Sequence, residues 1–159
     1  MHDPTLVQTV QQICSQDSRY HPDAYCFVLD ALDFTVRLFK KNLKDGQDRH
    51  VTGKELLEGT RLFALQEFGP MAHTVLNAWG VHCTRDFGEI VFNLVEFGKL
   101  RKTEQDRRED FDDGYDFHAA FVEPFLPKSR PRAQRQRQRR KPRRTRTVPP
   151  PGPDAAPRP

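Results

Sequence analysis

The apolar residues of this chain end at Leu126, and that boundary limits what the sequence can fold into. All 16 aromatic residues and 53 of the 57 hydrophobic residues precede Pro127. Only residues 1–126 can therefore bury enough apolar surface to offset the conformational entropy lost on folding. A segment of this length supports one hydrophobic core without disulfides or a structural metal. We expect one helical globular domain at 1–126 and a tail at 127–159.

The charges divide at the same point. Residues 1–126 carry 14 basic and 21 acidic residues, whereas residues 127–159 carry 12 basic residues and one acidic residue. The net charge of +4 therefore combines a body of net −7 with a tail of net +11. The tail also holds nine prolines and no aromatic residue, a composition that predicts a disordered Arg/Pro-rich segment.

The spacing of apolar residues in the body predicts a succession of helices. Five segments with helical spacing run from about 4 to 15, Pro22 to Gly46, Thr52 to Gly69, Pro70 to Gly80 and Thr84 to Gly98. Thr52 and Glu55 have the spacing of a capping box, and Thr84 is a candidate N-cap. The sequence after Gly98 fits two short strands with a turn at Gly114, or an irregular segment that ends in a short helix.

The fold class that follows is mainly α. We expect a compact helical domain of five to six helices, with a short winged-helix-like β-hairpin after Gly98 as one alternative. Residues 70–102 resemble a helix-turn-helix with a wing, in which the second helix would enter a major groove. Arg85 and Asn93 are its plausible base contacts, but the acidic residues around them oppose binding to phosphate.

The tail carries the clearest functional pattern. Ten basic residues and no acidic residue lie in a span of 17 positions, which favours binding to phosphate through release of counterions. Without aromatic residues to stack on bases, the tail is expected to bind RNA or DNA without sequence specificity. The alternatives are an inert solvated extension, or contact with anionic lipid or an acidic protein surface. The predicted nucleic-acid-binding residues are Arg130, Arg132, Arg135, Arg137, Arg139, Arg140, Lys141, Arg143, Arg144 and Arg146.

Patterns typical of catalysis or metal binding are weak in this sequence. The three cysteines form no C-x-x-C pair, and the histidines are scattered, so we expect no cofactor and no metal site. An enzyme with a small-molecule site at His21, His73 or Cys83 is the competing interpretation. No apolar run approaches the roughly 18 to 20 residues that span a bilayer, and the N-terminal residues lack a signal-peptide pattern, so we expect a cytoplasmic protein without a membrane span.

Five segments of the body form a recognisable combination: Arg19–Tyr25, Ala31–Val36, His50–Gly59, Phe68–Ala72 and Asp86–Val95. Together they resemble a family of conserved hypothetical proteins known from planctomycetes and verrucomicrobia. The resemblance covers about residues 8–125, with Asp86–Val95 as its most specific part, and leaves the tail outside. It implies a bacterial cytosolic protein, and no catalytic residue carries over.

The functional interpretation that the sequence favours is a non-enzymatic binding module. Its Arg-rich tail is expected to associate electrostatically with RNA or DNA, while the acidic helical body contacts a protein partner. Two alternatives stay open: a small-molecule enzyme, and a protein that acts only through protein–protein contacts and has an inert tail.

Overall fold

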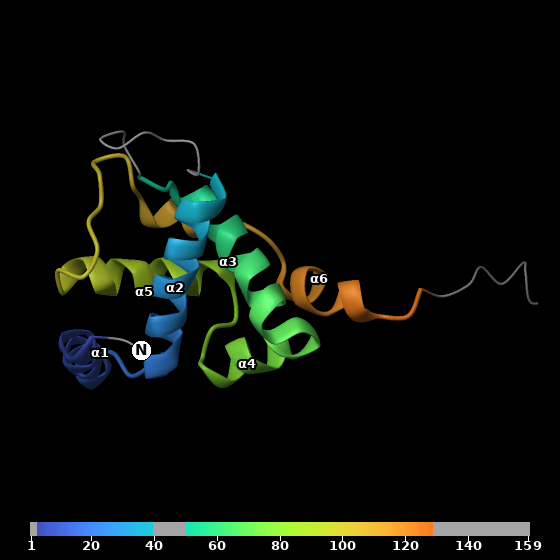
Figure 1. The fold of residues 1–159 in the computed structure, drawn as a ribbon, viewed down its shortest axis with the longest axis horizontal. Helices are drawn as coiled ribbons and strands as arrows, with labels where there is room; N and C mark the ends of the chain where they lie inside the picture. Colours follow the sequence, from blue (N-terminus) through green and yellow to red (C-terminus); the bar gives the residue numbers. More distant parts are fainter. Residues whose placement is uncertain (1–2, 40–49, 129–159) are drawn as a thin grey trace, which may run out of the picture. The chain divides into compact units, whose positions relative to one another are not determined.

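The computed structural model describes residues 3–39 and 50–128. Met1–Leu126 forms one compact unit, to which the chain from Pro127 onward does not belong. The unit contains six α-helices among the described residues: α1 Pro4–Gln16, α2 Pro22–Phe39, α3 Gly53–Phe68, α4 Ala72–Ala78, α5 Thr84–Glu96 and α6 Phe117–Phe121 (Figure 1). Three short 3-10 turns accompany them, at Gly69–Met71, Arg108–Phe111 and Glu123–Phe125.

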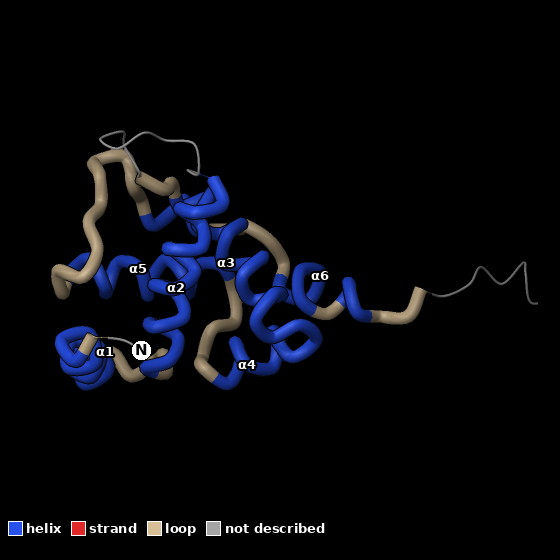
Figure 2. Tube along the Cα trace, in the orientation of Figure 1, coloured by secondary structure: helices blue, strands red, loops and turns tan. Residues whose placement is uncertain are grey.

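The fold is mainly α, as the spacing of apolar residues predicts. Within residues 3–39 and 50–128 no residue lies in a β-strand (Figure 2), so the winged-helix-like hairpin after Gly98 does not form. The other alternative is correct: an irregular segment leads to the short helix α6. The hairpin alternative does not form because Asp116 accepts a hydrogen bond from the backbone N–H of Ala119 at 2.8 Å and so caps a helix where the second strand would lie.

Helices α2 and α3 pack against each other at the centre of the body, and α5 crosses α2 (Figure 1). The close approach of α2 and α3 depends on Gly59, because a Cβ at this position would overlap the side chain of Thr35. Thr35 is fully buried, and its hydroxyl donates to the carbonyl of Ala31 at 2.6 Å. Because Gly59 of α3 has no side chain, Thr35 of α2 can lie in the interface, where its hydroxyl is hydrogen-bonded within its own helix.

Aromatic rings join α6 to the rest of the core. Phe121 is fully buried, and its ring centroid lies 5.2 Å from that of Phe117. Phe117 in turn lies 5.8 Å from the ring of Phe87 on α5. These edge-to-face and tilted contacts bury large apolar areas, which explains why a helix of one turn holds its position.

The sequence correctly predicts the Thr52–Glu55 capping box, because both of its reciprocal hydrogen bonds are present. The prediction for Thr84 is wrong. Its hydroxyl donates to the carbonyl of Phe111 at 2.7 Å and accepts from the backbone N–H of Gly114 at 3.1 Å. Thr84 therefore fastens the 111–114 turn to α5 instead of capping the helix.

Candidate functional site

The ten basic residues of the predicted nucleic-acid site, from Arg130 to Arg146, lie outside the described residues. The functional geometry that the structure provides is therefore that of the helical body. It has two notable regions: the junction of α5 with the α1–α2 connection, and a cavity between α2, α3, α5 and residues 100–111.

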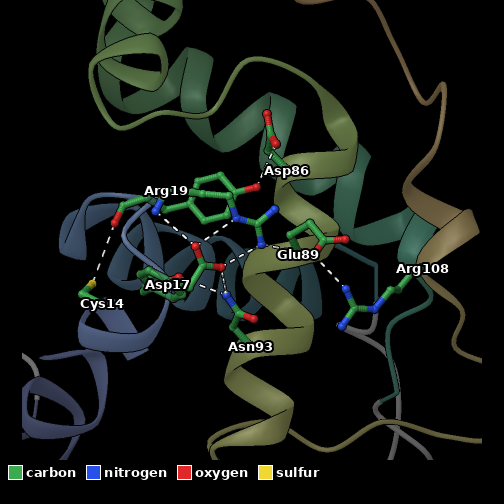
Figure 3. A network of polar contacts seen from close by, with 9 residues as sticks. Cys14, Asp17, Arg19, Asp86, Glu89, Asn93 and Arg108 are labelled. Atoms are coloured by element: carbon green, nitrogen blue, oxygen red, sulfur yellow. Dashed lines mark hydrogen bonds and ion pairs between the residues drawn. The ribbon is translucent and has the colours of Figure 1, made fainter. Parts of the chain in front are cut away.

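The α5 junction bears on the helix-turn-helix hypothesis, because it involves both of the proposed base contacts. Asn93 donates to Asp17 Oδ2 at 3.0 Å and to the hydroxyl of Tyr25 at 3.2 Å (Figure 3). Arg85 is exposed, with its Nε 3.7 Å from Asp112 Oδ1. Asn93 thus holds α5 against the α1–α2 connection, and its amide is not presented to a partner.

Asp86 is the best-connected carboxylate of the junction. Its Oδ1 accepts from the hydroxyl of Tyr20 at 2.8 Å (Figure 3). Its Oδ2 accepts from the backbone N–H groups of His82 at 2.8 Å and Cys83 at 3.1 Å. Burial opposes ionisation of Asp86, but the backbone donors and Tyr20 outweigh it and hold its pKa below the usual value. Asp86 therefore caps the first turn of α5 and links it to Tyr20.

A chain of ion pairs continues along the same side of α5. Arg19 contacts Asp17 with two nitrogens, at 2.9 and 2.7 Å, and this pairing holds the pKa of Asp17 well below its usual range. Glu89 lies between Arg19 at 3.4 Å and Arg108 at 2.7 Å (Figure 3). The side chains of both arginines are exposed, so each pair contributes little alone, yet together they connect three segments.

We expect Asp86→Ala to lower the free energy of unfolding by about 1.5 kcal/mol, because the hydroxyl of Tyr20 and two backbone N–H groups lose a charged acceptor. Urea denaturation followed by circular dichroism measures this change. The matched control is Glu96→Ala, which removes an exposed carboxylate from the last turn of the same helix and should change stability by less than about 0.5 kcal/mol. Equal losses in the two variants would contradict the role assigned to Asp86.

The second region is a cavity of about 250 Å³ between α2, α3, α5 and residues 100–111. Most of its wall is apolar. Leu56 and Phe111 are buried, whereas most of the other apolar side chains of the wall are only half-buried. The apolar lining consists of Leu32, Val36, Val51, Leu56, Val91, Phe92, Val95, Leu100 and Phe111.

A histidine–aspartate pair also lines this cavity. His50 Nε2 lies 3.0 Å from Asp106 Oδ1, and Asp106 Oδ2 accepts from the backbone N–H of Thr103 at 2.7 Å. Burial raises the pKa of Asp106, but the bonds from Thr103 and His50 outweigh it and lower the pKa below its usual value. The sequence gives no sign of this pair, because 56 positions separate the two residues and no motif surrounds either of them.

The structure does not bring together the residues of the competing enzyme hypothesis. His21 Nδ1 accepts from the backbone N–H of Asp23 at 3.2 Å, and His73 lies 3.3 Å from the side-chain amide of Asn77. Cys83 donates to Asp86 at 3.4 Å. The lining of the 250 Å³ cavity does not include His21, His73 or Cys83.

Cys83 is exposed and lies beside the carboxylate of Asp86. Partial desolvation and the negative charge of Asp86 raise the pKa of this thiol, which lowers the fraction of the thiolate that a nucleophile requires. Cys83 lines a second, more open hollow of about 590 Å³, together with Asp112, Asp113 and Asp116. The described residues contain no group of three or more His, Cys, Asp or Glu side chains placed to hold a metal ion.

Comparisons of the chain with models of protein families, with curated protein sequences and with solved structures give no match. A search of the described residues also finds no helix with the length and apolarity needed to cross a bilayer.

Proposed function

We propose that the protein is a non-enzymatic binding module of the bacterial cytoplasm. In this proposal the segment Arg130–Arg146 associates electrostatically with RNA or DNA, while the acidic helical body contacts a protein partner. The observation that carries the proposal is the charge partition, net −7 before Pro127 and net +11 from Pro127 onward.

The chemistry of the basic segment supports a phosphate ligand. Its ten cationic side chains can each neutralise a phosphate and release condensed counterions, which drives association with any nucleic acid. Nine of the ten are arginines, whose planar guanidinium groups match phosphate oxygens with paired hydrogen bonds. Because this attraction depends on the phosphate charge and not on contacts to base edges, we propose that the segment binds without sequence preference.

The structure of the body supports assigning this binding to the tail. In the helix-turn-helix region the amide of Asn93 is engaged by Asp17 and Tyr25, and exposed acidic residues, Asp112, Asp113 and Asp116, follow the turn at Phe111. A negatively charged surface repels phosphate at low salt. The same negative charge suits a basic protein surface, which is the partner chemistry that we propose for the body.

The experiment that tests this proposal compares the whole chain with residues 1–126, using one RNA and one DNA duplex of arbitrary sequence. Fluorescence anisotropy across a range of salt concentrations measures the affinity. The whole chain should bind both nucleic acids, and residues 1–126 should bind neither. Equal binding by residues 1–126 would place the site in the body and contradict the proposal.

A further inference from the structure

We infer that the cavity between α2, α3 and α5 is a binding site for a small amphipathic carboxylic acid. The apolar part of this ligand occupies the cavity, and its carboxylate lies at the mouth beside Arg101 and Lys102. This inference is independent of nucleic-acid binding, because it uses only residues of the helical body.

The volume of the cavity sets the size of the ligand. An apolar cavity of about 150 Å³ accommodates benzene, which has six non-hydrogen atoms. By proportion, the 250 Å³ of this cavity accommodates about ten non-hydrogen atoms. Octanoate, with a straight apolar chain and one carboxylate, has this size and serves as the probe.

The walls indicate that the inner part of the ligand is apolar. Val36 of α2, Val91 and Val95 of α5, and Leu100 line the cavity while only half-buried. These side chains are ones that a domain core would ordinarily cover. An alkyl chain that fills the cavity removes their remaining apolar surface from water, and this provides the main driving force for binding.

Two of the three carboxylates that line the cavity are already compensated within the fold. Asp106 is bonded by His50 and by Thr103. Asp110 accepts from the backbone N–H of Arg107 at 3.0 Å, and a Cβ added at Gly53 would lie 3.0 Å from the Cβ of Asp110. The backbone N–H of Arg107 therefore already donates to Asp110, and the side chain of Asp110 lies beside the first residue of α3.

The two cations of the lining have no such hydrogen bonds among the described residues. Arg101 and Lys102 line the cavity and are exposed. Among the described residues Arg101 has no hydrogen bond or ion pair, and the Lys102 ammonium lies 5.4 Å from the ring centroid of Phe92. Asp33 is the third carboxylate and the one that no side chain in the described part of the chain pairs with. Within the described residues of the lining, two cations and one carboxylate thus have no hydrogen bond or ion pair through their charged groups, and this balance favours an anionic head group.

The test is a titration of the whole chain, labelled with ¹⁵N, with octanoate, octan-1-ol and octylammonium, followed by amide chemical shifts. We expect octanoate to shift the amides of Val91, Val95 and Leu100 with saturation on the order of 1 mM, the affinity typical of a ligand of this size. Octan-1-ol and octylammonium should bind at least about tenfold more weakly, since neither offers the carboxylate that Arg101 and Lys102 would contact.

Arg101→Glu is the variant that tests the head-group assignment, and Arg85→Glu is its matched control. Both arginines are exposed, but Arg85 lines the other hollow. Arg101→Glu should lower the affinity for octanoate about tenfold or more and raise the affinity for octylammonium. Arg85→Glu should leave both affinities unchanged. The inference is overturned if octanoate shifts none of these amides, if octan-1-ol or octylammonium binds the unaltered chain as tightly, or if the two variants behave alike.

Discussion

Replacement of Arg135, Arg137, Arg139, Arg140 and Arg143 by glutamine is expected to lower the affinity of the whole chain for nucleic acid by about 10³ to 10⁵ at 0.1 M salt. Each substitution removes one cation that neutralises a phosphate, and each such cation contributes roughly 0.7 to 0.9 to the slope of log K against log salt. The slope should therefore fall to about half of its original value. Fluorescence anisotropy at several salt concentrations measures both quantities.

The matched control replaces the same five arginines by lysine. Lysine keeps the positive charge but lacks the planar guanidinium group, so counterion release and the salt slope should be retained while affinity changes modestly. An equal loss of binding in the glutamine and lysine variants would mean that the guanidinium geometry, and not the charge, decides binding. That outcome would contradict the electrostatic account.

Gly59→Ala is expected to lower the free energy of unfolding by about 3 kcal/mol, because the new methyl group overlaps the side chain of Thr35 in the α2–α3 interface. The expected sign is informative, since alanine in place of glycine inside a helix ordinarily stabilises by roughly 1 kcal/mol. Urea denaturation monitored by circular dichroism measures the change.

A double-mutant cycle with Thr35→Ala tests the cause of this destabilisation. Thr35→Ala removes the hydroxyl and methyl groups nearest to the added Cβ, so the double variant should be more stable than the sum of the single effects predicts, by about 1 kcal/mol or more. Additive effects would contradict steric overlap as the cause. A stabilising Gly59→Ala would contradict the close approach of α2 and α3.

The parts of the fold that the sequence predicts well depend on local interactions. Pro22 begins α2, as proline at a first helical turn indicates. The Thr52–Glu55 capping box forms as predicted because both of its hydrogen bonds join residues three positions apart. The periodicity after Thr84 likewise gives α5, with Phe87, Ile90 and Leu94 buried.

The features that the sequence does not predict depend on contacts between distant residues. Threonine is a residue type that often caps helices, yet the hydroxyl of Thr84 forms hydrogen bonds with Phe111 and Gly114, which are 27 and 30 positions away. The His50–Asp106 pair and the cavity beside it require α2, α3, α5 and the irregular 100–111 segment to meet. Periodicity identifies the helices but not how they pack, so neither the pair nor the cavity could be derived from spacing.

We propose that phosphate binding belongs to the basic segment Arg130–Arg146 and not to the helical body. The most direct test is the salt dependence of binding for the whole chain and for residues 1–126, on a DNA duplex and on a single strand. With ten phosphate contacts, the whole chain should give log–log slopes of about −9 on the duplex and about −7 on the single strand, and residues 1–126 should show no measurable binding. Binding by residues 1–126 with the slope of the whole chain would contradict the claim.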